Sequence, residues 1–95
     1  MIEVLFEDED IKISVEYIES VDIYIVHSKV SSWSLSKYKK YLGLFGTALN
    51  IMKSRGVEYL YTIPPTDHIE KWQRMFGFED SGYRPKGWKL MRIKT

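Results

Sequence analysis

The first third of the chain alternates apolar and polar residues with the two-residue period of β-strands. Residues 11–17 carry an apolar side chain at every odd position, and residues 2–6 and 21–27 show a related alternation. Four consecutive acids at 7–10 would repel one another inside a sheet, and residues 19–20 are polar, so both segments are expected to be turns. The pattern predicts three consecutive strands over 2–6, 11–17 and 21–27.

From Ser34 onward the apolar residues recur at spacings of three and four, which is the pattern of an amphipathic helix. Ser34 or Ser36 can cap its start, and Gly56 is a natural residue to follow its end. Gly43 and Gly46 lower helix propensity by about 1 kcal/mol each relative to alanine, so we expect another segment to pack closely against them. The apolar positions are Tyr38, Tyr41, Leu42, Phe45, Ala48, Leu49 and Met52.

The second half of the chain predicts three more strands and a short helix. Residues 57–63 are nearly continuously apolar and aromatic, as in a central parallel strand covered on both faces. Asp67 and Glu70 have the spacing of a capping box that opens a short helix, whose apolar face includes Ile69, Trp72 and Phe76. Residues 78–83 and 88–93 read as two antiparallel strands.

The predicted fold is therefore a single α/β (α+β) domain over 1–95 with the element order βββαβαββ. The long helix connects the third and fourth strands, so these two should be parallel and linked by a right-handed crossover. The expected sheet is mixed and mostly antiparallel.

Composition excludes several kinds of chemistry. The chain has no cysteine, which excludes disulfides, thiolate metal sites and a cysteine nucleophile. It has no apolar run long enough for a membrane span, and its start lacks the basic and apolar regions of a signal peptide. These features predict a protein of the cytoplasm with no membrane partner.

The net charge of +1 conceals an uneven distribution. Residues 1–28 carry eight acids and one base, giving −7, whereas residues 29–95 carry thirteen bases and five acids, giving +8. The first interpretation is that the two halves lie side by side and neutralise each other at the surface. The alternative is an anionic partner for the basic half, and exposed aromatic residues there would suit nucleic acid. The residues of such a face are Trp33, Tyr83, Arg84, Lys86, Trp88 and Lys89.

Three lysines and two histidines are candidate site residues. Lys37, Lys39 and Lys40 lie at the start of the long helix, where they oppose its dipole unless an anion is nearby; solvated lysines are the simpler interpretation. His27 ends the third predicted strand and is a candidate base, although a hydrogen-bonded surface histidine is the commoner case. His68 reads as a polar residue near a helix start. The two histidines are too far apart in the chain to indicate a metal site.

The element order, with residues 55–61 and the segment 72–79 ending Phe76-Gly77-Phe78-Glu79, resembles the C-terminal two-thirds of the GNAT acyltransferase fold. Nothing at the N-terminus corresponds to the first strand and the two following helices of that family. The resemblance implies an acyl-CoA pyrophosphate loop at residues 36–41, which contains no glycine here. It also implies an asparagine at the position of Thr66 and a tyrosine general acid at the position of Gln73.

A narrower resemblance is to small internal virion proteins of podovirus-type phages. It rests on residues 33–36, the lysine-rich segment 37–40, and residues 66–69. It implies a GNAT-like protein, catalytically degenerate, that acts as a binding or structural component with a protein partner, in the host cytoplasm or the virion. The alternative is an acetyl-CoA-dependent N-acetyltransferase with an atypical pyrophosphate loop. If acyl-CoA binds, the implied cofactor-binding residues are His27, Ser34, Ser36, Lys37, Lys40 and Thr66.

Overall fold

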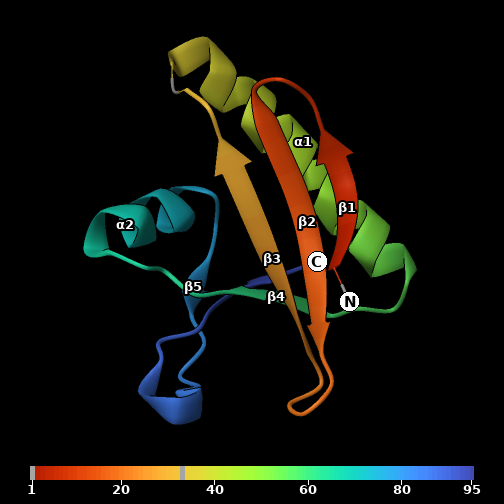
Figure 1. Cartoon of the computed structure of the whole chain (residues 1–95), viewed down its shortest axis with the longest axis vertical. Helices are drawn as coiled ribbons and strands as arrows, with labels where there is room; N and C mark the ends of the chain where they lie inside the picture. The colour runs from red at the N-terminus through yellow and green to blue at the C-terminus, as the bar shows by residue number, and fades with distance from the viewer. Residues whose placement is uncertain (1, 33) are drawn as a thin grey trace.

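The computed structural model describes residues 2–32 and 34–95 as a mixed α+β domain (Figure 1). Its elements follow the predicted order βββαβαββ, with a short 3₁₀ turn added before the last strand. The elements are β1 (Ile2–Glu7), β2 (Ile11–Ile18), β3 (Ile23–Val30), α1 (Leu35–Ser54), β4 (Tyr59–Thr62), α2 (Asp67–Met75), β5 (Glu79–Asp80), the 3₁₀ turn Pro85–Gly87 and β6 (Met91–Lys94).

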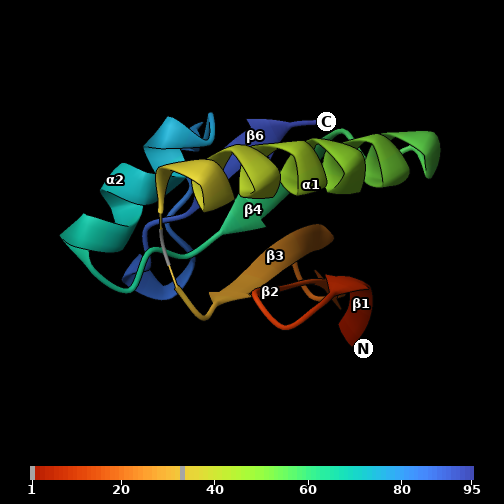
Figure 2. The ribbon, with the colours of Figure 1, turned by 90° about the horizontal axis from the view of Figure 1, so that it is seen from above.

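The strands form one sheet in the order β1-β2-β3-β4-β6-β5. The β3–β4 pair is parallel and the other pairs are antiparallel, which confirms the predicted mixed sheet. Seen from above, α1 and α2 lie on the same side of β2 and β3 (Figure 2). One face of this part of the sheet is therefore covered by the helices, and the opposite face has no described helix.

The core lies between this helix-covered face and α1. Ile11, Ile13 and Val15 of β2 are buried in it, and Val26 of β3 lies opposite Val15. From α1 the stripe of three- and four-residue spacing supplies the facing side chains, which confirms the helical prediction. Buried core residues of the later elements and of α1 are Tyr41, Phe45, Ala48, Met52, Leu60, Phe78, Leu90 and Met91.

The ends of α1 are formed as the sequence predicts. Ser34 is the N-cap, and its hydroxyl accepts a hydrogen bond from the backbone N–H of Lys37. Gly56 follows the C-cap with φ +82°, a left-handed conformation that favours glycine. The expectation about Gly43 and Gly46 is wrong, because an added Cβ at either position would meet no atom of the described residues within 4 Å.

Three predicted boundaries are also wrong. The third strand begins at Ile23 because Asp22, at φ 53°, completes the preceding turn, and it continues past His27 to Val30. The N-cap of α2 is Thr66, whose hydroxyl accepts from the backbone N–H of Ile69, so the capping box proposed from Asp67 does not form.

The two C-terminal strands are shorter than predicted. β5 contains only Glu79 and Asp80, and β6 begins at Met91. Gly82, inside the predicted strand 78–83, has φ +76°, a left-handed conformation that is incompatible with an extended strand.

Candidate functional site

A pocket lies where β3 and β4 separate. The two strands pair at Tyr24–Leu60 and Ile25–Tyr61, after which β3 continues to Val30 while β4 ends at Thr62. We call this divergence the β3–β4 fork. A pocket of about 330 Å³ lies in the fork, bounded by β2, β3, α1, β4, α2 and Phe78.

The second helix closes one side of this pocket. Ile69, Trp72, Gln73 and Phe76 lie at spacings of three, one and three along α2 and all line the pocket, since residues three and four apart share a helix face. None of the α2 residues is fully buried, because the face that would otherwise pack into a core borders the pocket. The predicted common face of Ile69, Trp72 and Phe76 is confirmed.

Gln73 is the most unusual group in the pocket. Its amide Nε2 donates to the hydroxyl oxygen of Thr62 over 3.3 Å. Its Oε1 is buried and has no hydrogen-bond partner among the described residues. Leaving a buried acceptor unpaired costs about 1–3 kcal/mol, so this oxygen marks a place where a donor would be favoured.

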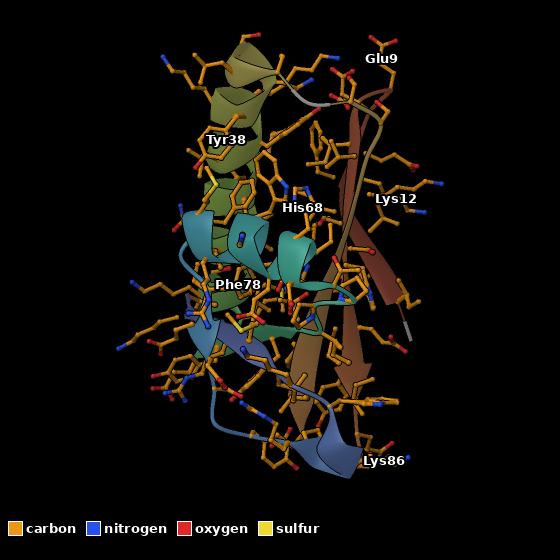
Figure 3. All side chains as sticks on the ribbon, turned by 90° about the vertical axis from the view of Figure 1, so that its left-hand side faces the viewer. Glu9, Lys12, Tyr38, His68, Phe78 and Lys86 are labelled. Atoms are coloured by element: carbon orange, nitrogen blue, oxygen red, sulfur yellow. The ribbon has the colours of Figure 1, made fainter. Side chains whose placement is uncertain are left out.

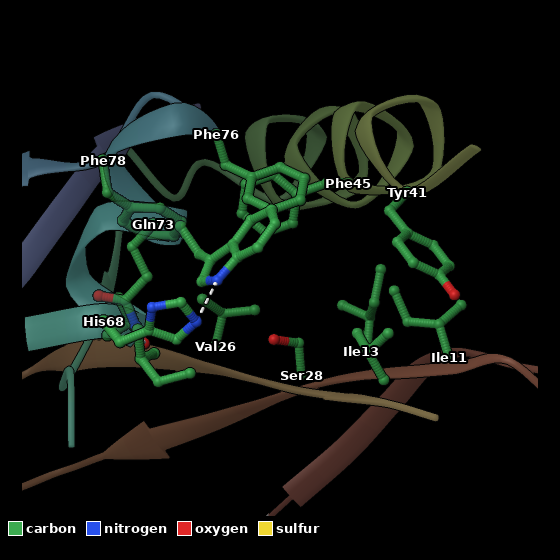
Figure 4. A pocket seen from close by; sticks show the side chains of 14 residues that line it. Ile11, Ile13, Val26, Ser28, Tyr41, Phe45, His68, Gln73, Phe76 and Phe78 are labelled. Carbon is green, nitrogen blue, oxygen red and sulfur yellow. Dashed lines mark hydrogen bonds between the residues drawn. The ribbon is translucent and has the colours of Figure 1, made fainter. Parts of the chain in front are cut away.

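His68 and Trp72 form a second polar pair at the exposed end of the pocket (Figure 4). The indole N–H of Trp72 donates to His68 Nε2 over 3.0 Å, and the two rings meet edge to face at 85°. Because Nε2 accepts, the neutral ring carries its proton on Nδ1. The other polar lining groups are Ser28, Thr62, Gln73 and the hydroxyl of Tyr41, which donates to the backbone oxygen of Ser32, and no described lining residue is an Asp, Glu, Lys or Arg.

The structure places His27 away from this pocket. Residues 26, 28 and 30 of β3 line the pocket, so His27 points to the opposite face of the sheet. There its Nε2 lies 3.1 Å from a carboxylate oxygen of Glu16, and about half of its side chain is exposed. Because β3 continues to Val30, His27 does not occupy a strand end.

The predicted residues at the start of α1 do lie together, at the same end of the molecule as the β1–β2 turn (Figure 3). The ammonium of Lys37 lies 3.2 Å from Asp10, and that of Lys40 lies 2.8 Å from Asp8 and 3.1 Å from Asp10. The hydroxyls of Ser34 and Ser36 lie 3.2 Å apart. The anions that oppose these lysines are therefore carboxylates of the protein itself.

This cluster shifts the titration of its members. The bond from Lys40, followed by the backbone N–H groups of Ile11 and Asp10, lowers the pKa of Asp8 to about 2. Lys40 and then Lys37 lower the pKa of Asp10, and Asp8 and then Asp10 raise the pKa of Lys40. All of these groups remain charged at neutral pH.

Ion pairs between the acidic and basic halves confirm that the two halves neighbour each other. Besides the pairs of Lys37 and Lys40, Arg55 binds Glu3 through both of its terminal nitrogens, at 2.8 and 2.7 Å. The first interpretation of the charge distribution was that the two halves neutralise each other at the surface. The ion pairs at both ends of α1 agree with it.

The predicted basic and aromatic face is partly neutralised. Arg84 is paired with Asp80 at 2.6 Å and Lys89 with Glu70 at 2.8 Å, although Tyr83 and Trp88 are exposed. The prediction also included Trp33, which lies outside the described residues.

Thr66 does not line the pocket, and its hydroxyl is engaged in capping α2. The sequence analysis did not identify Ser28 and Thr62 as site residues, and it named Gln73 only as the position where the resemblance implies a tyrosine general acid. The available signal was the position of Gln73: a polar residue four places after Ile69 on the apolar face of α2. No local pattern could have placed Thr62 beside Gln73 or Ser28 on the opposite side of the same pocket.

No family model matches this chain, and no curated protein or solved structure matches it either. The GNAT and phage resemblances therefore stay predictions. Neither helix in the described part of the chain has the length and apolar character needed to cross a membrane.

Proposed function

We propose that this chain is a GNAT-like binding module without acyl-transfer activity, and that its ligand site is the pocket in the β3–β4 fork. The observation that carries the proposal is the pocket itself, an apolar concavity with a few converging polar groups between diverging strands and α2. Such concavities are the usual form of small-molecule sites. Its volume of about 330 Å³ suits a small organic molecule.

The polar groups of the pocket support binding better than catalysis. A general acid or base needs a titratable group able to exchange a proton with the substrate. Gln73, at the position where the resemblance implies a tyrosine acid, carries an amide that does not titrate. His68 uses its Nε2 to accept the indole N–H of Trp72. These groups can orient a bound molecule through hydrogen bonds.

The start of α1 is poorly suited to a pyrophosphate. Lys37 and Lys40, two of the implied phosphate-binding residues, are already paired with Asp8 and Asp10. A phosphate approaching them would meet two carboxylates whose lowered pKa values keep them ionised. The negative charges of Asp8 and Asp10 would repel the negative charge of the phosphate and disfavour its binding.

One observation favours the alternative of an acetyl-CoA-dependent N-acetyltransferase. The pocket is lined by Tyr41, the last residue of the segment 36–41 where the resemblance implies the pyrophosphate loop. Calorimetric titration with acetyl-CoA separates the two proposals. Micromolar binding followed by acetyl transfer to an amine would overturn the non-catalytic proposal, whereas no heat at millimolar acetyl-CoA would overturn the enzyme alternative.

Binding in the pocket is tested with indene, a small apolar bicyclic molecule, followed by NMR chemical shifts. We expect shifts at pocket residues such as Ile13, Val26 and Ile69. Ser28→Phe should fill the pocket and abolish them, whereas Lys29→Phe, on the opposite face of β3, should leave them unchanged. Absence of any pocket shift both with millimolar indene and with indole, its analogue that carries an N–H group, would overturn the proposed site.

The remaining functional predictions concern macromolecular partners. A protein partner and a phage or virion setting rest on the short motif resemblances alone. Nucleic-acid binding by the basic half would give steeply salt-dependent retention on DNA. The pairing of Arg84 and Lys89 with acids reduces the charge available for such binding.

A further inference from the structure

We infer that the pocket selects an uncharged ligand carrying an N–H or O–H donor, and that the side-chain oxygen of Gln73 accepts this hydrogen bond. The inference rests on the proposed function, because it specifies the chemistry of a ligand in the same pocket. Its starting point is the buried Oε1 of Gln73, which has no partner among the described residues.

The side chain of Gln73 is restrained at its backbone by α2 and at its amide by a hydrogen bond. Its backbone belongs to α2, and its Nε2 donates to the Thr62 hydroxyl at the end of β4 over 3.3 Å. This bond restrains the amide group, and Oε1, which belongs to the same planar group, points away from Thr62. The acceptor is therefore fixed before a ligand arrives, which reduces the ordering cost of binding.

Other donors in the pocket are already committed or distant. The indole N–H of Trp72 is donated to His68. Figure 4 shows Ser28 on β3, across the pocket from Gln73 on α2, and no hydrogen bond is drawn between them. A donor for Gln73 Oε1 must then come from a molecule that enters the pocket.

The walls define the rest of the ligand. Ile13, Val26, Phe45 and Phe78 provide apolar surface, and no Asp, Glu, Lys or Arg is found among the described lining residues. A charged group would lose its hydration without gaining an ion pair. The preferred class is a neutral, mainly aromatic or aliphatic molecule of one or two rings with a single donor.

The discriminating experiment compares three bicyclic probes of nearly equal size by NMR titration: indole, which has an N–H donor, 1-indanone, which has only an acceptor, and indene, which has neither. We expect indole to bind the wild-type protein at least ten-fold more tightly than indene or 1-indanone. In Gln73→Met, which replaces the amide with a side chain of similar length, the advantage of indole over indene should shrink to about two-fold or less. The matched control is Lys71→Met, an exposed position on the same helix, which should keep the ten-fold preference.

The wild-type comparison decides the inference even if Gln73→Met fails to fold. Equal affinity for indole and indene would overturn the donor preference while leaving the proposed pocket intact. A preference for 1-indanone would also overturn it, because the amide would then present its N–H to the ligand. Absence of binding by all three probes would overturn the proposed function together with this inference.

Discussion

Replacing Gly43 and Gly46 by alanine should stabilise the protein. Both glycines lie inside α1, and neither has the positive φ that would require glycine. Within the part of the chain that the structure describes, an added Cβ meets nothing within 4 Å at either site, so no clash opposes the substitution. Alanine is favoured over glycine in a helix interior by about 0.8–1 kcal/mol, because glycine loses more backbone freedom on folding.

Each substitution should therefore raise the midpoint of thermal unfolding by roughly 4–8 °C for a domain of this size. The double variant should gain nearly the sum, since the two methyl groups add no shared contact. Circular dichroism at 222 nm during heating, with urea unfolding at 25 °C as a second measurement, reports both quantities.

The matched control is Gly56→Ala. At φ +82° an alanine is strained, so this variant should lose about 1–2 kcal/mol. A Gly43→Ala variant that is neutral or less stable than wild type would refute the reasoning. It would show that another molecule or a different packing requires the bare backbone of α1.

Two further predictions concern electrostatics and capping. Because the pKa of Asp8 is lowered from 3.8 to about 2, its ionised form stabilises the fold above pH 3.8, and this contribution should disappear as the pH falls to about 2. Asp8→Asn should thus unfold at a lower temperature at pH 7 and show a smaller further drop on acidification; identical pH profiles would contradict the role of Lys40. Thr66→Ala should cost about 1 kcal/mol in urea unfolding, whereas Thr66→Ser should cost almost nothing. A larger loss in Asp67→Ala than in Thr66→Ala would instead favour Asp67 as the cap.

The sequence predicts the elements whose periodicity is local and uninterrupted. In β2 the alternating residues Ile11, Ile13 and Val15 are buried, so alternation identifies the strand and its core side, although Tyr17 at the same period is exposed. In α1 the apolar stripe runs to Met52 and Gly56 follows soon after, so the sequence indicates both the length of the helix and its caps. A strand must contain several residues before an alternation of apolar and polar side chains can be recognised. β5 has only two residues and shows no such pattern.

The candidate site was less predictable, for a physical reason. A strand boundary misplaced by three residues made His27 a candidate for the chemistry, although its side chain faces away from the pocket. The anions of Lys37 and Lys40 come from a turn nearly thirty residues earlier in the chain. Contacts of this kind depend on strand register, which hydrophobic pattern alone does not specify.

The short parallel pairing at the β3–β4 fork has a consequence for the order of folding. β1, β2 and β3 are joined by short turns, whereas pairing β3 with β4 must close a loop that contains all of α1. Closing long loops before their contacts can form is slow, so the meander of β1, β2 and β3 should form before it joins β4. A molecule bound in the fork contacts both β3 and β4, which pair late in folding. Its binding would therefore slow the separation of β3 from β4 during unfolding.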